Sequence, residues 1–330
     1  MLWFHSEARR SVWSFWRRRA GCKLVENNSW PTAPTTVTII GLKELEESTD
    51  PLLHTLIQFA HCYKNQADTL YDLEFLTDTR GRRVTTFGFH AGFAGAAAGP
   101  LALSSQKNGE KLGHLQPFEN DAAMVASINQ LLVGSGKGIK VLVIGAWEDA
   151  EEAQLISLGK LGLRSWDDIV KWDMDKTAKG GPFQEILNID IFVNCIYLNS
   201  QIPSFITQDR IITVGPQRKL SIIVDISCDK TNPFNPTPIC SINTTFPIVP
   251  VGVGNLSSAE NPMFSVVSID HFPSFPPPPP PPPREASKEF STDPLLSLLE
   301  FSNQQTVCVW TDVEKLFTEK VVTAIAVVGA

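Results

Sequence analysis

The sequence lacks a hydrophobic run long enough to cross a membrane, and it lacks an excess of basic residues. A transmembrane helix needs about 20 consecutive apolar residues, and the apolar segment at 321–330 is shorter than that. The chain carries 28 Lys and Arg against 35 Asp and Glu, a net charge of -7. Because nucleic acid is polyanionic, we do not expect an acidic chain to bind it generally. We therefore expect neither a membrane protein nor a nucleic-acid-binding protein.

The sequence also lacks cysteines at the C-x-x-C spacing of zinc and redox sites. Its six cysteines are scattered, which fits a reducing cytosol in which thiols are inert core residues. We therefore expect no metal site and a cytoplasmic location. The segment ARRSVWSFWRRRAG is rich in Arg and Trp but poor in Ala, which weighs against mitochondrial targeting. We expect no peroxisomal signal at the C-terminus either.

Strand-like and helix-like segments alternate along the 330 residues. Nine segments are apolar or β-branched and are expected to be strands: 36–44, 57–63, 69–76, 84–89, 139–146, 168–173, 190–198, 220–227 and 263–270. Three segments are expected to be helices: 50–59, with Asp50 as cap and Pro51 at its first position, then 90–103 and 119–136. Such alternation predicts an α/β protein with parallel sheets. The two series of strands predict two domains.

Charged side chains follow or precede the predicted strands of the first series. Lys43 follows TVTIIG, His61 follows LIQFA, and Arg82 and Arg83 precede VTTFGF. In α/β enzymes, chemistry is placed at the carboxyl ends of strands. A partly desolvated Lys and a His can act as acid-base groups near neutral pH, and adjacent arginines bind carboxylates or phosphates. Each residue also has an ordinary structural explanation. Lys43 can be a surface lysine, His61 a hydrogen-bonded histidine at a strand end, and Arg82 and Arg83 part of a turn.

Collinear blocks of sequence together resemble one enzyme family. These blocks are IIGLKELEE, IQFAHCYKNQA, TLYDLEFL, GRRVTTFGFHAGFAGAA, VKWDMDKTAKGGPFQEI, DIFVNCIYL, VDISCDKTNPFNPTPI, VVSIDHFPS and PREASKEFS. They are similar to saccharopine dehydrogenase of the NAD-dependent, lysine-forming type, from the fungal aminoadipate pathway. The resemblance implies two Rossmann-like domains with parallel sheets and an inter-domain cleft. It implies a substrate and catalytic domain at 1–88 plus 273–330, and an NAD-binding domain at 89–272.

The resemblance implies oxidative deamination of L-saccharopine to L-lysine and 2-oxoglutarate, with NAD as cofactor. The base that deprotonates the substrate amine would be Lys43, and the acid-base group for imine hydrolysis would be His61. The implied substrate-binding residues are Gln66, Arg83, Phe87, Ser227, Cys228 and Asp229. The implied cofactor-binding residues are Arg82, Gly145, Asp173, Thr177, Tyr197, Ile226, Ile269, Asp270, His271 and Phe272. Asp173 follows the second strand of its domain, where a carboxylate binds ribose hydroxyls and favours NAD over NADP.

The glycine turn of the family, G-A-x-G-R-x-G-x-G, is kept only at Gly145-Ala146. The residues that follow are bulky or acidic: Trp147, Glu148, Asp149, Glu151 and Glu152. Acidic residues in a first helical turn stabilise the helix by about 0.3–1 kcal/mol. At roughly 5 Å and an effective dielectric of about 20, each would repel a phosphate charge by about 3 kcal/mol. The sequence therefore leaves open an inactive paralogue that keeps a carboxylate-binding cleft, or a product of altered exon boundaries.

Three further departures affect the first domain and its return crossing. The segment at 1–19 does not match the family, so we expect a strand and a substrate-binding Arg to be missing. The segment NQADTLYDLEFL joins two blocks that the family separates by a helical segment, so Asp68 and Thr69 leave no room for a crossover between the strands predicted at 57–63 and 69–76. Eight prolines at Pro276–Pro283 form a polyproline II rod, which is a spacer or a ligand for SH3- or profilin-type domains. Apart from such domains, we expect the partners to be small-molecule substrates. We expect the chain to be a monomer.

Overall fold

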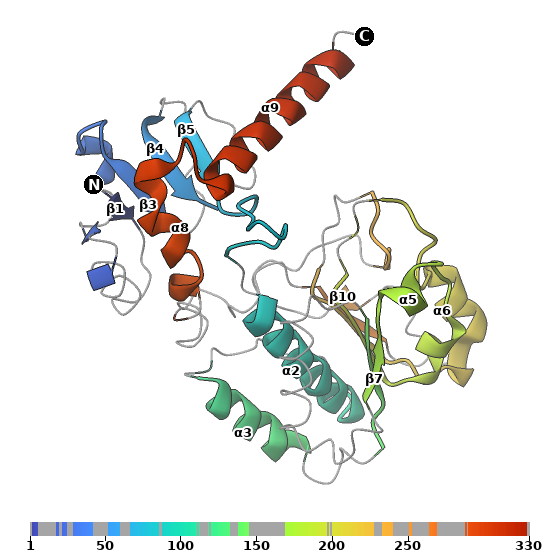
Figure 1. Ribbon diagram of the computed structural model, residues 1–330. Coiled ribbons are helices and arrows are strands. Elements are labelled where there is room, and N and C mark those ends of the chain that lie inside the picture. Colours follow the sequence, from blue (N-terminus) through green and yellow to red (C-terminus); the bar gives the residue numbers. More distant parts are fainter. Residues whose placement is uncertain are drawn as a thin grey trace. The chain divides into compact units, whose positions relative to one another are not determined.

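The computed structural model divides into two compact units, and each is described by itself (Figure 1). Unit 1 comprises residues 1–86 and 287–330, and unit 2 comprises residues 87–286. The predicted domains, with their bounds at 88/89 and 272/273 and their roles, stay predictions. The structure describes residues 2–5, 18–19, 22–24, 29–41, 52–59, 67–85, 88–110, 112, 118, 120–132, 138–144, 169–196, 198, 200–227, 233–239, 251–252, 264–268, 288 and 290–328.

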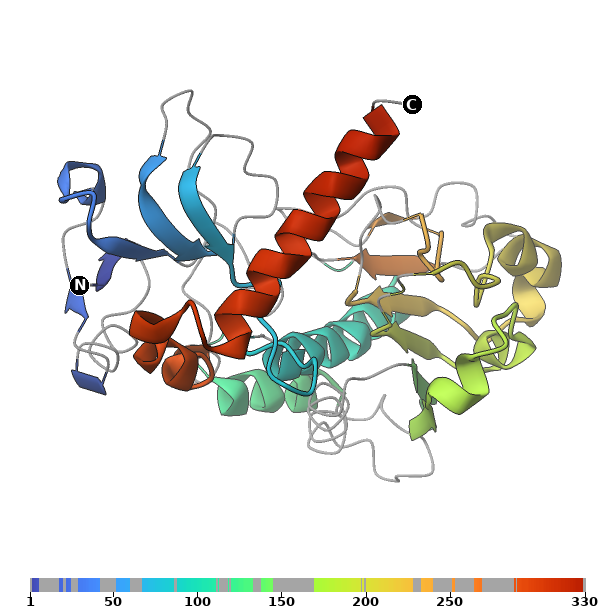
Figure 2. The same cartoon turned by 45° about the horizontal axis from the view of Figure 1, so that its top comes forward.

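Unit 1 contains a parallel sheet whose strand order is β2-β1-β3-β4-β5. In chain order the strands are β1 (Leu2–His5), β2 (Lys23–Leu24), β3 (Thr38–Gly41), β4 (Leu52–Gln58) and β5 (Ala67–Asp72). The neighbouring arrows can be followed in Figure 2. The short helix η1 (Trp30–Thr32) packs Trp30 against Ile39 and Leu56, which are buried in the sheet. These apolar contacts form the described core of this sheet.

The C-terminal part of unit 1 consists of helices. They are α8 (Leu295–Leu299), η6 (Phe301–Asn303) and α9 (Cys308–Val328). Trp310 of α9 is buried, donates its ring N–H to the carbonyl of Ser297 at 3.2 Å, and packs edge-on against Tyr71 of β5. This aromatic contact attaches the helical segment to the edge strand. In the described part of the chain, none of the helices has the length and apolar character needed to span a membrane.

Three expectations for unit 1 were wrong. The helix predicted at 50–59 is the strand β4, which pairs on both sides with parallel neighbours. The N-terminal segment supplies a strand after all, because β1 lies between β2 and β3. The strand β5 does pair in parallel with β4. Since β4 ends at Gln58 rather than near Tyr63, residues 59–66 are available to connect the two strands.

Unit 2 contains a six-stranded sheet of order β10-β11-β9-β8-β6-β7. In chain order the strands are β6 (Val141–Ile144), β7 (Ile169–Trp172), β8 (Ile191–Asn194), β9 (Ile222–Asp225), β10 (Val251–Gly252) and β11 (Ser265–Ser268). All neighbours are parallel except β10 and β11, which are antiparallel. Five of these strands lie within the predicted segments, and β10 was not predicted. The expected α/β class with parallel sheets is therefore confirmed.

Both faces of the sheet in unit 2 are covered by apolar side chains. One face packs Val141 and Val143 with residues of α2 (Gly88–Lys107) and α3 (Asp121–Leu132), which lie side by side in Figure 1. The other face packs Leu142 and Ile144 with residues of η3 (Gln184–Asn188) and α6 (Gln208–Val214). Burial on two faces explains why these strands are continuous apolar runs.

Helix α2 runs across the sheet from the carboxyl ends of the strands to their amino ends. Near its middle, an added Cβ at Gly95 would lie 2.4 Å from Cδ1 of Ile226, just past the carboxyl end of β9. Near its C-terminus, Gln106 donates hydrogen bonds to Ser265 Oγ at 2.9 Å and to the Ser221 carbonyl at 3.3 Å, at the amino ends of β11 and β9. The sequence correctly predicts a helix at 90–103. The strand predicted at 84–89 was wrong, because α2 already begins at Gly88.

Candidate functional site

The carboxyl ends of β6 and β8 form a topological switch point in unit 2. The chain passes from β6 to β7 on one side and then returns to β8 on the other side of β6. In open α/β sheets, ligands bind outside the carboxyl ends of the strands at such a point. Ile144 and Asn194 are register partners at this position. The residue that follows Ile144 is the predicted cofactor residue Gly145, which lies outside the described residues.

A buried polar network lies at the carboxyl ends of β8 and β9. Asn194 donates from Nδ2 to Asp225 Oδ1 at 2.9 Å, and Thr237 donates from Oγ1 to Asp225 Oδ2 at 2.8 Å. Asn235 Oδ1 accepts from the backbone N–H of Thr237 at 2.8 Å. Burial raises the pKa of Asp225 from 3.8 to about 6, and the two hydrogen bonds oppose that rise. The network attaches the segment 233–239 to the strand ends beside the switch point.

Asp173 follows the carboxyl end of β7, and its side chain is exposed. Its Oδ1 accepts from the backbone N–H of Lys176 at 3.1 Å, which caps the short helix α5 (Met174–Thr177). Its carbonyl accepts from the hydroxyl of Thr177 at 3.0 Å. The structure thus brings together the predicted cofactor residues Asp173 and Thr177. An exposed carboxylate at this strand end can accept hydrogen bonds from ribose hydroxyls.

Ile226 and Ser227 come directly after β9, next to the buried Asp225. The backbone N–H of Ile226 donates to the carbonyl of Asn194 at 2.9 Å, so the segment continues beside β8 past the end of the strand. Both side chains are half-buried. The absence of a side chain at Gly95 of α2 leaves room for Ile226.

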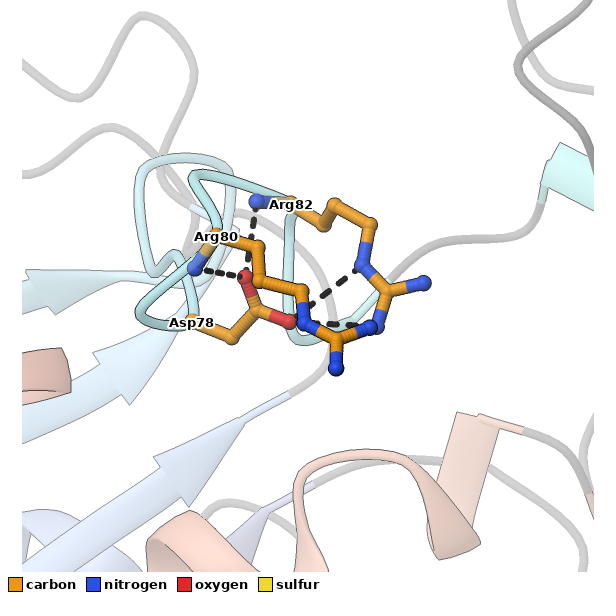
Figure 3. Close-up of polar contacts among 3 residues, drawn as sticks. All are labelled: Asp78, Arg80 and Arg82. Atoms are coloured by element: carbon orange, nitrogen blue, oxygen red, sulfur yellow. Dashed lines mark hydrogen bonds and ion pairs between the residues drawn. The ribbon is translucent and has the colours of Figure 1, made fainter.

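The predicted arginine Arg82 lies in an exposed turn of unit 1, which Figure 3 shows with Asp78 and Arg80. Asp78 Oδ1 accepts from the backbone N–H groups of Arg80 and Arg82 at 2.8 and 2.9 Å. The guanidinium of Arg82 donates to Asp78 Oδ2 at 3.3 Å. These contacts lower the pKa of Asp78, with the Arg82 N–H as the largest cause. Gly81 has a φ of 76°, a conformation that favours glycine in turns.

Arg83 leaves the same turn and forms a salt bridge with Glu74 at 2.5 Å. Its backbone forms an isolated antiparallel bridge with Thr77. This single bridge closes the turn between Thr77 and Arg83. The consecutive residues Arg82 and Arg83 thus have separate carboxylate partners in this turn, Asp78 and Glu74.

Three residues end neighbouring strands at the carboxyl edge of the sheet in unit 1. Gly41 ends β3, Gln58 ends β4 and Asp72 ends β5, with Gln58 and Asp72 as register partners. The predicted catalytic residues follow this row, Lys43 after Gly41 and His61 after Gln58. Both lie outside the described residues.

Most of the predicted site residues lie outside the described residues: Lys43, His61, Gln66, Phe87, Gly145, Tyr197, Cys228, Asp229, Ile269, Asp270, His271 and Phe272. The acidic residues at 148–152 and the prolines at 276–283 lie outside them too. Among the residues that are described, no three His, Cys, Asp or Glu side chains group as metal ligands.

Sequence reasoning missed Asn194, Asp225, Thr237 and Gln58. A signal for the first two was available, because an Asn and an Asp interrupt the apolar runs IFVNC and IIVDI at the ends of predicted strands. Thr237 is in a proline-rich segment far from either strand, so its contact depends on tertiary folding. Gln58 was hidden because its segment was predicted to be helical.

Comparison with known proteins identifies relatives along most of the chain. The chain is 44% identical over 323 residues to saccharopine dehydrogenase (NAD(+), L-lysine-forming) of Neurospora crassa, covering 92% of this chain and 84% of that protein. It is 45% identical over 323 residues to the protein of that name from Yarrowia lipolytica, covering 91% and 84%. For the Schizosaccharomyces pombe protein of that name, identity is 40% over 320 residues, covering 91% and 84%.

Two other comparisons add less. No family model matches the chain. Among solved structures, an L-alanine dehydrogenase matches with a TM-score of 0.48 and 11% identity, covering 88% of this chain and 79% of that one. The curated relatives therefore carry the assignment, and their identity and coverage show that the chain belongs to the family of NAD(+)-dependent, L-lysine-forming saccharopine dehydrogenases.

Proposed function

We propose that this chain catalyses the NAD-dependent oxidative deamination of L-saccharopine, which yields L-lysine and 2-oxoglutarate. The observation that carries the proposal is the identity of 40–45% to proteins named for this activity, over 91–92% of the chain. The carboxyl edges of the two sheets support it, since each presents polar side chains where α/β enzymes bind ligands.

The residues of unit 2 suit the adenosine end of NAD. The exposed carboxylate of Asp173 would bind the ribose hydroxyls and repel a 2′-phosphate. Ile226 would line the cofactor side of the carboxyl edge, as would Thr177, which is held by the carbonyl of Asp173. When bound, NAD+ accepts the hydride that leaves the carbon beside the secondary amine of the substrate.

The protein's own groups would manage the protons of the reaction. Lys43 would take the proton from the secondary amine, because only the neutral amine can be oxidised to an imine. His61 would deliver the water that adds to the imine carbon and would protonate the leaving amine of lysine. Arg83, Gln66 and Phe87 would bind the substrate, whose several carboxylates suit a cationic site. Arg82 would bind the cofactor.

Three predicted substrate-binding residues belong to unit 2. Ser227, Cys228 and Asp229 follow β9 and would face the substrate, while the motif at 269–272 would contact the cofactor. We also propose that the chain acts as a cytoplasmic monomer. Size-exclusion chromatography with light scattering tests the monomer, and a dimer at working concentration would refute it.

Product analysis tests the proposed activity. The purified chain is incubated with L-saccharopine and NAD+, and lysine, 2-oxoglutarate and NADH are quantified. We expect the three products in equal amounts, and we expect Lys43→Met and His61→Gln to lower kcat by at least about a hundredfold, the usual contribution of general acid-base catalysis.

The sequence at 148–152 leaves a second function to be tested beside the first. The acidic residues at 148–152 take the place of the family's glycine turn, where a pyrophosphate would be repelled. If saccharopine binds in calorimetry but no NADH forms and NAD+ does not bind, the chain is a carboxylate-binding paralogue without catalysis.

A further inference from the structure

Gln58 has a buried side-chain amide that makes no hydrogen bond within the described part of the chain. Its residue is 1% exposed, and neither Oε1 nor Nε2 makes a hydrogen bond. Its backbone is satisfied, since its carbonyl accepts from the N–H of Leu73 at 3.0 Å. The unpaired groups are therefore confined to the carboxamide. Because buried amides are nearly always hydrogen-bonded in folded proteins, this exception needs a reason.

The neighbouring residues make room for this amide. Gly41 ends β3 beside Gln58, and an added Cβ there would lie 2.6 Å from Gln58 Oε1 and 3.3 Å from its Cβ. Any other residue at position 41 would push the amide away. The amide therefore occupies space that only glycine leaves free.

A carboxylate stands on the other side of the amide. Asp72 of β5 is the register partner of Gln58, so the two side chains point to the same face of the sheet. Asp72 Oδ1 accepts from the backbone N–H of Glu74 at 2.9 Å. A carboxylate has two oxygens, so Asp72 can still accept from a ligand. The edge thus offers an amide donor, an amide acceptor and a negative charge in one row.

This set of groups is complementary to the zwitterionic end of an amino acid. An α-carboxylate accepts from the amide Nε2, while an α-ammonium donates to Oε1 and to the carboxylate of Asp72. A dicarboxylate such as 2-oxoglutarate would engage only the amide nitrogen and would be repelled by Asp72. Of the two halves of saccharopine, the lysine half carries a free α-ammonium beside its α-carboxylate.

We propose that Gln58, with Asp72, binds the α-amino-acid end of the lysine half of the substrate at the carboxyl edge of unit 1. This assignment rests on the proposed function for the identity of the ligand. It places the amino-acid end beside the strand ends from which the segments bearing Lys43 and His61 continue.

The substitution Gln58→Met tests the proposal, because it keeps the length of the side chain and removes both polar groups. In the full-length chain we expect the calorimetric Kd of L-lysine to rise about ten- to a hundredfold, the loss of hydrogen bonds to charged groups. We expect Tm to rise by about 2–4 °C, because a buried unpaired amide is removed. Cadaverine, which lacks the α-carboxylate but keeps the ammonium, should lose less affinity than L-lysine on Gln58→Met, because only the contact with Oε1 is removed.

Gln106→Met is the matched control. Gln106 is a glutamine whose amide is paired, to Ser265 Oγ and the Ser221 carbonyl at the amino ends of the strands in unit 2. The same substitution there should lower Tm and leave the Kd of lysine unchanged. Gly41→Ala should raise the Kd of lysine as Gln58→Met does, and should add no further loss in the double variant.

The outcomes separate this proposal from the proposed activity. If Gln58→Met lowers Tm as the control does, the amide has a structural partner and the proposal is wrong. It is also wrong if lysine does not bind the wild type, or if its Kd is unchanged by Gln58→Met. If lysine binding follows Gln58 but no NADH forms from saccharopine, the proposed catalysis fails while the assignment of Gln58 stands.

Discussion

The side-chain amide of Asn194 donates a hydrogen bond of 2.9 Å to the buried carboxylate of Asp225, which joins the carboxyl ends of β8 and β9. The second oxygen of Asp225 accepts from Thr237, so the segment 233–239 is held at the same place. This contact lies directly before Ile226 and Ser227. The ends of two central strands are thus fixed by side chains where a cofactor is expected to bind.

The Asp225 contact predicts a pH dependence of stability. Burial raises its pKa from 3.8 to about 6, so between these values the folded state binds a proton that the unfolded chain has released. Stability from this group is therefore present below about pH 4 and falls as pH rises through 6, by about 3 kcal/mol. In urea unfolding, Asp225→Asn should gain stability relative to the wild type between pH 4 and pH 7. A difference that is constant with pH would contradict the buried carboxylate.

The contact between α2 and the end of β9 predicts that Gly95→Ala changes stability in opposite directions in two backgrounds. Gly95→Ala places a Cβ 2.4 Å from Ile226 Cδ1, and overpacking costs about 1–3 kcal/mol. Alanine in a helix regains up to about 1 kcal/mol over glycine. We expect Gly95→Ala to destabilise the wild type and to stabilise the Ile226→Ala variant, in which the clashing atoms are removed. Equal effects in the two backgrounds would show that the helix does not lie against Ile226.

Substitutions of Asp173 are expected to change cofactor preference and stability separately. Asp173→Asn keeps an oxygen that accepts from the N–H of Lys176 but loses the charge, so stability should change little. The ratio of kcat/KM for NAD+ to that for NADP+ should fall about tenfold, because the 2′-phosphate is no longer repelled. Asp173→Ala should in addition cost about 0.5–2 kcal/mol through loss of the cap. Unchanged cofactor preference in both variants would exclude Asp173 from the ribose site.

The turn around Asp78 predicts faster amide exchange when its carboxylate is removed. Asp78 accepts from the N–H groups of Arg80 and Arg82, and its pKa is lowered by these contacts. The contacts are present above its ordinary pKa of 3.8 and are lost as pH falls through the lowered value. Asp78→Ala should speed exchange at both amides about fivefold, because each N–H loses its side-chain acceptor. Asp78→Asn, which keeps an acceptor oxygen, should speed it less, and equal exchange in all three proteins would refute the turn.

The class of fold could be predicted because the strands of unit 2 are buried on both faces. The run VLVI is apolar throughout and IFVN is apolar up to its final Asn, and this pattern is typical of parallel strands covered by helices. At Leu52–Gln58 the pattern predicted the wrong element. Leu52, Leu56 and Ile57 have the spacing of a helix, although the segment is a strand. Short apolar runs do not distinguish a strand from a buried helix. Pairing with β3 and β5 on both sides decided the outcome there.

The candidate site could be predicted only where a residue directly follows a strand. Asp173 was predicted because ribose-binding acids occupy a fixed place after the second strand of such folds. Its role as a cap of α5 was not predicted, since the helix is only four residues long. The contact of Thr237 with Asp225 joins residues from a loop and a strand, and no spacing in the sequence encodes it. The pairing of Gly41 with Gln58 likewise depends on strand register.

The formation of NADH from L-saccharopine by the full-length chain tests the central claim most directly. With saturating NAD+, we predict an absorbance of NADH that rises in proportion to added saccharopine and is abolished when saccharopine is omitted. The same preparation should bind NAD+ in calorimetry. No NADH, together with no binding of NAD+, would contradict the account and would show that the residues after Ala146 have lost the cofactor.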